Sequence, residues 1–222
     1  MLSIKKFFPF ALIIFSSHFS LLAVADETAN NAEDLVRSFL NSIQTYQADF
    51  RQQVFNESNK IVEEGSGEFW LNRPGKIKWR YDLPWSYEVV SDGLKVWMYD
   101  AELEQVTIRN AGLAVDSSPA SLLAGEEDIL NDYNFLKTDS SGYDLSPLSQ
   151  KITLESKKAN VDFEEITLVF RDDLIQQIAF SDRFGQRTEI QFTDIQFNHS
   201  VNSSVFAIDI PEGTDVIDES DL

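Results

Sequence analysis

The chain has 222 residues and a formal net charge of −19, from 18 Lys and Arg residues against 37 Asp and Glu residues. Such a charge repels the phosphates of nucleic acids and anionic lipid surfaces, so neither is expected as a partner. The absence of cysteine excludes disulfides, a thiol nucleophile and lipidation of the chain on cysteine. The composition therefore indicates an acidic protein that holds its fold without covalent cross-links.

The first 25 residues have the three regions of a secretory signal peptide. Lys5–Lys6 precede an apolar run over about Phe7–Val24, and an Ala-Val-Ala cleavage pattern ends at Ala25. A permanent membrane anchor is the alternative, but Pro9 interrupts the run and no basic stop-transfer flank follows it. We predict a cleaved signal peptide over residues 1–25 and a single domain over residues 26–222, because no linker or repeat divides that part.

The next segment, Asn30–Gln47, is predicted to form one amphipathic helix. Asn30, with Glu33 three residues later, provides a capping pattern for its start. Apolar side chains recur at three- and four-residue spacing, which indicates a face that packs on a sheet. The residues of this apolar stripe are Leu35, Val36, Phe39, Leu40, Ile43 and Tyr46.

From Asp49 onward the apolar period changes from helical spacing to two, and about eleven short strands are expected. A meander over Phe50–Ile108 turns at Arg73-Pro74-Gly75 and at Asp92-Gly93, and the latter is a strong hairpin signal. Strands resume after Asn134. The expected later strands are Phe135–Lys137, Ile152–Glu155, Ile166–Phe170, Gln177–Phe180, Thr188–Phe192 and Phe206–Ile210.

The middle of the chain, Gly112–Tyr133, loses the period-two pattern. Pro119 has the position of a helix start and Gly125 that of a helix stop. One or two short helices are therefore expected to interrupt the sheet. Their apolar residues are small and aliphatic.

A sheet of about eleven strands exceeds what a filled small barrel requires, because about eight strands already enclose an interior filled by side chains or one small ligand. The long helix, the short middle helices or a ligand would fill the remaining space. Alternation gathers aromatic side chains on one face, and both a packed aromatic core and a ligand cavity satisfy this pattern. These aromatic residues are Phe69 or Trp70, Trp79, Tyr81, Trp97 and Tyr99.

Patterns typical of enzymes are missing after residue 25. His199 is the one histidine there, so a transition-metal site and a Ser-His-Asp triad are not expected. Adjacent acids such as Glu63-Glu64 are expected by chance in a chain with 37 acids, although two acids are enough for a glycosidase and leave that class open. We predict a protein that is not an enzyme and that has no metal and no cofactor.

Nearly all of the chain after residue 25 resembles the LolA family of periplasmic outer-membrane lipoprotein carrier proteins. The resemblance is most specific between Arg73 and Tyr99. The matching segments are Phe50-Arg51-Gln52, Gly67–Pro74, Trp79, Val90–Gly93, Val96-Trp97, Tyr99, Glu104–Thr107, Ser118–Ala124, Phe206 and Pro211-x-Gly213.

The resemblance implies an unclosed antiparallel β-barrel of about eleven strands, with a helical lid over a hydrophobic cavity. It further implies a periplasmic monomer that takes triacylated lipoproteins from an inner-membrane ABC lipoprotein-releasing complex and passes them to an outer-membrane receptor. That receptor is lipid-anchored, and this chain has no cysteine to anchor. The alternative is a carrier or sensor of another lipid or glycolipid that uses the same cavity.

The resemblance also assigns site residues. Arg73 matches an arginine that hydrogen-bonds the lid backbone, and its five donors suit that role. The other lid-locking residues are Ser118, Pro119, Leu122 and Leu123. The expected cavity residues are Trp70, Ile77, Trp79, Tyr81, Tyr87 and Trp97, with Phe69 replacing Trp70 if the register slips by one residue. Ile77 departs from the family pattern, because relatives often carry an aromatic residue there.

Overall fold

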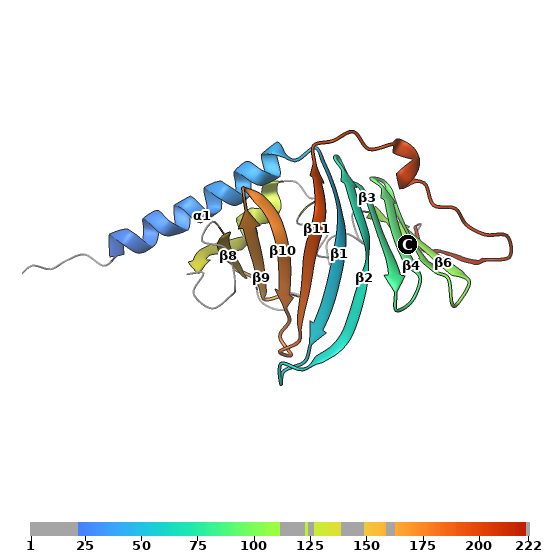
Figure 1. Cartoon of the computed structure of the whole chain (residues 1–222), viewed down its shortest axis with the longest axis horizontal. Helices are drawn as coiled ribbons and strands as arrows, with labels where there is room; N and C mark the ends of the chain where they lie inside the picture. The colour runs from blue at the N-terminus through green and yellow to red at the C-terminus, as the bar shows by residue number, and fades with distance from the viewer. Residues whose placement is uncertain (1–21, 112–122, 124–126, 139–148, 159–162, 221–222) are drawn as a thin grey trace, which may run out of the picture.

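A computed structural model describes residues 22–111, 123, 127–138, 149–158 and 163–220 (Figure 1). Within these ranges, twelve strands form one sheet in the order β12-β6-β5-β4-β3-β2-β1-β11-β10-β9-β8-β7. The two edge strands of this order, β12 and β7, do not pair with each other among the described strands. The predicted unclosed sheet with few helices is confirmed, with twelve strands in place of about eleven.

The described elements follow one another along the chain. The helical elements are α1 (Leu22–Ser42) and the 3₁₀ helices η1 (Glu127–Asp132) and η2 (Ser203–Phe206). The strands of the first half are β1 (Thr45–Phe55), β2 (Ile61–Asn72), β3 (Lys76–Leu83), β4 (Tyr87–Asp92), β5 (Lys95–Asp100) and β6 (Gln105–Asn110). Those of the second half are β7 (Tyr133–Thr138), β8 (Ser149–Ser156), β9 (Glu165–Arg171), β10 (Leu174–Ser181), β11 (Arg187–Phe197) and β12 (Asp215–Asp218).

The helix differs from its prediction at both ends. It spans Leu22–Ser42 rather than Asn30–Gln47, and Thr45–Gln47 belong to β1. Tyr46 explains the earlier end, because its fully buried side chain donates a hydrogen bond of 2.6 Å to the Ile175 carbonyl from within the sheet. Its helical spacing in the sequence was therefore misleading, since tertiary packing overrides local periodicity.

Asn198 closes the carboxyl end of α1 from far along the chain. Its side-chain nitrogen donates to the Ser42 carbonyl at 2.8 Å, and its side-chain oxygen accepts from the backbone nitrogen of Gln44 at 2.7 Å. Helix ends leave carbonyl and amide groups without intrahelical partners, so this contact supplies what the local sequence lacks.

The α1 helix packs on one face of the sheet, which we call the core face and which carries Phe50 and Phe69. The Phe39 ring contacts Phe170 edge-on at 5.6 Å and stacks on Phe197 at 5.8 Å between ring centroids. Phe39 of the predicted apolar stripe therefore packs on β9 and β11, and α1 also packs against β7. In the described part of the chain, no helix combines the length and apolarity required to cross a membrane.

The C-terminal segment follows the upper edge of the sheet from β11 to η2 and returns to β12 beside β6 (Figure 1). The predicted strand Phe206–Ile210 is wrong, because Asn202 caps a 3₁₀ turn by accepting a hydrogen bond from the backbone nitrogen of Ser204. The sequence also missed β12, which pairs with β6 in parallel. All four β12 residues are exposed, so it carries no apolar alternation for a pattern to reveal.

Candidate functional site

A row of aromatic rings crosses the core face from its buried centre toward β4. Ring centroids of Phe69 and Trp79 are 4.7 Å apart, those of Phe50 and Tyr81 are 4.9 Å apart, and those of Tyr81 and Tyr87 are 6.4 Å apart. Phe69 is fully buried, whereas Tyr87 is partly exposed. The row therefore leads from the core to the surface at one end of the sheet.

Four of the six predicted cavity residues lie on the core face. Ile77 and Trp79 are buried, and Tyr81 and Tyr87 lie farther out along the same face. The other two, Trp70 and Trp97, lie on the opposite face, which we call the outer face, so the structure does not bring them together with those four. Phe69, the alternative to Trp70, is the core-face residue.

Strand register is the physical reason for this placement. Phe69 is opposite Trp79 in the β2–β3 pair, which places Trp70 beside Lys78 on the outer face. Trp79 is opposite Val89, and Val89 is opposite Met98, so Trp97 also faces outward. Counting residues through the Asp92-Gly93 hairpin would have revealed the placement of Trp97 from the sequence.

The outer face has a small apolar cluster of its own. Val90 and Val106 are fully buried, and Trp70 is 7% exposed. Phe206 of η2 is also buried, and η2 packs against β3 and β4. The Arg80 guanidinium lies 5.4 Å from the centroid of the Trp70 ring. Trp70 therefore packs beneath polar side chains and contributes to stability on the side away from the aromatic row.

Two glycines of β2 allow β3 to approach closely. A Cβ atom on Gly67 would lie 1.8 Å from the Arg80 carbonyl oxygen, which no side chain could tolerate without movement of the backbone. A Cβ atom on Gly65 would lie 3.3 Å from the Tyr81 ring. The glycines thus leave space for the Tyr81 ring to lie across β2.

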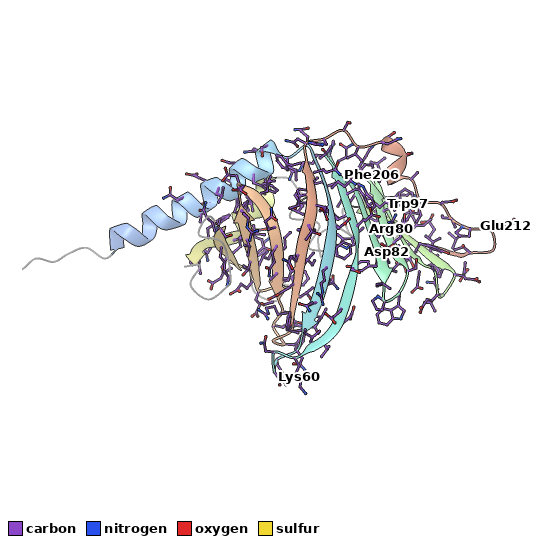
Figure 2. The ribbon with its side chains drawn as sticks, viewed as in Figure 1. Lys60, Arg80, Asp82, Trp97, Phe206 and Glu212 are labelled. Carbon is purple, nitrogen blue, oxygen red and sulfur yellow. The ribbon has the colours of Figure 1, made fainter. Side chains whose placement is uncertain are left out.

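At the outer end of the aromatic row lies a pocket of about 210 Å³. It lies toward the end of the β1–β2 hairpin, whose tip is marked by Lys60 in Figure 2, away from η2 and Phe206 at the other end of the sheet. Its lining residues are Gln52, Glu63, Gly65, Tyr81, Leu83, Pro84, Trp85 and Tyr87.

The sequence predicted only Tyr81 and Tyr87 among these lining residues. Trp85 belongs to the tryptophan-rich segment and is 53% exposed, and that combination was the available signal. Large exposed aromatic side chains beside an apolar hollow are typical of binding surfaces.

The polar groups of the pocket are few and specific. The Tyr81 hydroxyl donates to the Gln52 side-chain oxygen at 2.9 Å. Burial raises the pKa of Tyr81 above its ordinary value, and the negative charge of Glu63 raises it further. The pKa of Tyr87 is also raised, first by burial and then by Asp100. The pocket therefore combines aromatic walls with negative charge and keeps both phenols neutral.

Arg73, at the end of β2, joins two other parts of the chain. Its Nη1 donates to the Leu40 carbonyl at 2.7 Å, near the carboxyl end of α1. Its Nη2 and Nε donate to the Leu123 carbonyl at 2.8 and 3.2 Å. A positive charge at this end of a helix is favourable, because the unpaired carbonyls there carry partial negative charge.

The predicted lid is described at a single position. Leu123 is buried, at 1% exposure, and accepts the hydrogen bonds of Arg73. Ser118, Pro119 and Leu122 lie outside the described residues, so their part in a lid stays a prediction. Among the residues described, no group of three or more His, Cys, Asp or Glu side chains is placed to hold a metal ion.

Comparison with known proteins gives one consistent result. The family model described as "Outer membrane lipoprotein carrier protein LolA" matches residues 41–209. Two similar relatives carry the name "Outer-membrane lipoprotein carrier protein". The one from Chromohalobacter salexigens is 37% identical over 96% of this chain and 98% of its own length. The one from Methylobacillus flagellatus is 37% identical over 86% of this chain and 90% of its own length.

Solved structures are similar in fold at lower identity. An uncharacterized conserved protein from Thermus thermophilus aligns with a TM-score of 0.54 at 14% identity, over 86% of this chain and 99% of that one. At that identity the likeness concerns the fold alone.

Proposed function

Because this chain belongs to the LolA family of outer-membrane lipoprotein carrier proteins, we propose that it binds the acyl chains of lipoproteins in the periplasm and delivers them to the outer membrane. The observation that carries the proposal is the match of family and geometry: an apolar core face beside an arginine that fastens a separate segment through Leu123. On this proposal the protein acts as a chaperone and not as an enzyme.

The energetics of transport support a carrier. Each CH₂ group of an acyl chain costs about 0.8 kcal/mol in water, so three long chains together cost on the order of tens of kcal/mol. Free diffusion across an aqueous compartment is therefore excluded. The core face offers aromatic and aliphatic side chains as a replacement environment, provided that it opens to admit the chains. Nondirectional apolar contacts suit a carrier because it must also release its cargo.

We assign Arg73 the role of holding the closed arrangement. Its guanidinium hydrogen-bonds Leu40 on α1 and Leu123 in the predicted lid segment, so it fastens one to the other. Separation of the Leu123 carbonyl from the Arg73 guanidinium would make the core face accessible to acyl chains. The residues proposed to act with it are Ser118, Pro119, Leu122 and Leu123, and those proposed to contact the acyl chains are Ile77, Trp79, Tyr81 and Tyr87.

The proposed partners follow from this role. Triacylated lipoproteins are the cargo, an inner-membrane ABC lipoprotein-releasing complex is the donor, and an outer-membrane lipoprotein receptor is the acceptor. The protein would reach the periplasm by a signal peptide over residues 1–25, of which residues 1–21 lie outside the described part. Cleavage after Ala25 would remove the first four residues of α1. We expect the carrier to act as a monomer, without ATP of its own.

A release assay tests the proposal. The purified protein is added to spheroplasts that contain newly made, labelled lipoprotein, and the soluble fraction is examined for a one-to-one complex. Labelled complex should appear, and depletion of ATP inside the cells should abolish it. If no lipoprotein is released while the folded protein still binds a hydrophobic dye, the carrier proposal fails, and a carrier or sensor of another lipid or glycolipid replaces it.

A further inference from the structure

The pocket at the end of the aromatic row has a composition that acyl chains do not require. Tyr81, Tyr87 and Trp85 supply aromatic rings, while Glu63 and Gln52 supply a carboxylate and an amide. A purely apolar ligand gains nothing from Glu63 and would have to remove it from water. A cation gains from both kinds of group, because ring faces attract positive charge and a nearby carboxylate does so directly.

The charges around the pocket are arranged on one face. Glu63 is opposite Val54 in the β1–β2 pair, on the same face as the aromatic row. Asp100 raises the pKa of Tyr87, so it adds negative potential at the same side. Arg109 lies near enough to lower that pKa, but it forms an ion pair of 2.7 Å with Glu219. Glu63 and Asp100 therefore place negative charge near the two phenols, and the charge of Arg109 is shared with Glu219.

Glu64, the next residue in β2, has different surroundings from Glu63. It faces away from the pocket and accepts hydrogen bonds of 2.7 Å from Arg51 and from Gln53. The two neighbouring glutamates thus have different surroundings, one within an aromatic pocket and the other satisfied on the outer face. The pair provides a matched comparison for any experiment on charge.

We propose that this pocket binds the ammonium group of a lysine side chain in the cargo polypeptide, near its lipidated end. The inference rests on the proposed carrier function, because the pocket adjoins the face assigned to the acyl chains. A lipoprotein whose acyl chains lie along the aromatic row would place the first residues of its polypeptide at the outer end of that row. The pocket would then bind a part of the cargo polypeptide that the apolar face does not recognise.

Size and charge favour a side chain over a phospholipid headgroup. A cavity of about 150 Å³ holds benzene, so a pocket of about 210 Å³ suits one side chain and not several acyl chains. A phosphoethanolamine headgroup also carries an ammonium group, but its phosphate would lie close to Glu63 and Asp100. Like charges at such a distance disfavour that ligand.

Two synthetic lipopeptides test the proposal. Each has a tripalmitoylated cysteine followed by serine, and then either four lysines or four glutamines. Their dissociation constants are measured by displacement of a hydrophobic dye from the full-length protein at low salt. The lysine form should bind about tenfold more tightly than the glutamine form, which corresponds to about 1.4 kcal/mol. Peptides with one lysine at successive positions then locate the residue that is bound.

Variants separate the pocket from the overall charge of the protein. Glu63→Gln and Trp85→Leu should each reduce the lysine preference to about threefold or less, because each removes one of the two attractions. Glu64→Gln changes the net charge by the same amount as Glu63→Gln and should retain the preference. Equal preferences in Glu63→Gln and Glu64→Gln would refute the proposal and assign the effect to long-range charge.

Two further outcomes are distinguishable. N-acetyl-lysine methylamide and phosphoethanolamine are titrated separately, with tryptophan fluorescence as the readout. Binding of phosphoethanolamine at least as tight as that of the lysine compound would overturn the assignment to a polypeptide. If neither lipopeptide binds, the carrier function fails, whereas Glu63-dependent binding of the lysine compound would still support the cation pocket.

Discussion

Replacement of Arg73 by leucine tests the connection that the structure makes between α1, β2 and Leu123. The change removes the donors that reach the carbonyls of Leu40 and Leu123. Both of those residues are 1% exposed, so neither carbonyl gains water readily while the closed arrangement persists. Arg73→Lys retains the charge but has no planar fork, so it can serve one carbonyl well and not both.

The size of the effect follows from the number of acceptors. A hydrogen bond from a charged donor contributes about 1.5–3 kcal/mol. The Leu123 carbonyl can separate and regain water, so loss of its partner should shift the balance between open and closed forms by about 10- to 100-fold. The Leu40 carbonyl stays within the fold, so the free energy of unfolding should fall by about 1–3 kcal/mol, which a domain of this size survives.

Hydrogen exchange measured by mass spectrometry provides the assay. Peptides that contain Leu123 should exchange at least tenfold faster in Arg73→Leu than in the unchanged protein, with Arg73→Lys intermediate. Arg51→Leu is the matched control, because it removes an arginine from an exposed ion pair with Glu64 and should change neither exchange nor delivery. Unaltered exchange in Arg73→Leu together with normal lipoprotein delivery would refute the reasoning.

Three other predictions concern the core and the two faces. Burial raises the pKa of Tyr46 and Tyr81 above the ordinary value of about 10, so these phenols ionise first in the unfolded chain. The free energy of unfolding should therefore fall above about pH 10, by about 1.4 kcal/mol per pH unit for each phenol. Tyr46→Phe should reduce this slope and cost about 1–3 kcal/mol at pH 7 in urea unfolding. Gly67→Ala should cost more than about 3 kcal/mol by the same measurement, because its Cβ would overlap a backbone oxygen. Trp79→Leu should weaken binding of a tripalmitoyl peptide about tenfold, whereas Trp70→Leu should change it less than about twofold.

Each of these has a control within the chain. If the free energy of unfolding fell with pH as steeply in Tyr46→Phe as in the unchanged protein, the Tyr46 phenol would have to ionise in the folded state. Gly65→Ala should be milder than Gly67→Ala, since its nearest contacts are at 3.3 Å, and equal losses would contradict the steric argument. Equal losses of peptide affinity in the two tryptophan variants would contradict the assignment of the core face as the binding face.

Much of the fold could be predicted because its signals are local. Alternation of apolar side chains identified most strands, and Arg73-Pro74-Gly75 and Asp92-Gly93 identified turns that the structure contains. Gly75 and Gly93 both adopt positive φ, which glycine tolerates in tight turns. Such patterns depend on a few neighbouring residues, so they remain readable without knowledge of the partner strands.

The helix boundaries and the C-terminal strand could not be read in this way. Tyr46 has helical spacing from Phe39 and Ile43, yet it lies in β1 because its ring contacts Phe69 of β2 and Phe192 of β11, the two strands that pair with β1. The strand β12 has no alternation to display and exists because β6 offers a free edge. In both cases the deciding energy comes from contacts between residues far apart in the chain.

The sequence by itself determined an acidic, cysteine-free, mainly β protein, its family, and the importance of Arg73 and the tryptophan-rich segment. Only the tertiary structure decided which tryptophans share a face, which carbonyls receive the Arg73 guanidinium, and that Glu63 lies beside Tyr81 in a pocket. The physical reason lies in what alternation can show. Alternating apolar residues indicate which residues of a strand share a face, but they do not indicate which face of the sheet is covered. Register between strands fixes that choice, and register depends on turns, bulges and packing over the whole sheet.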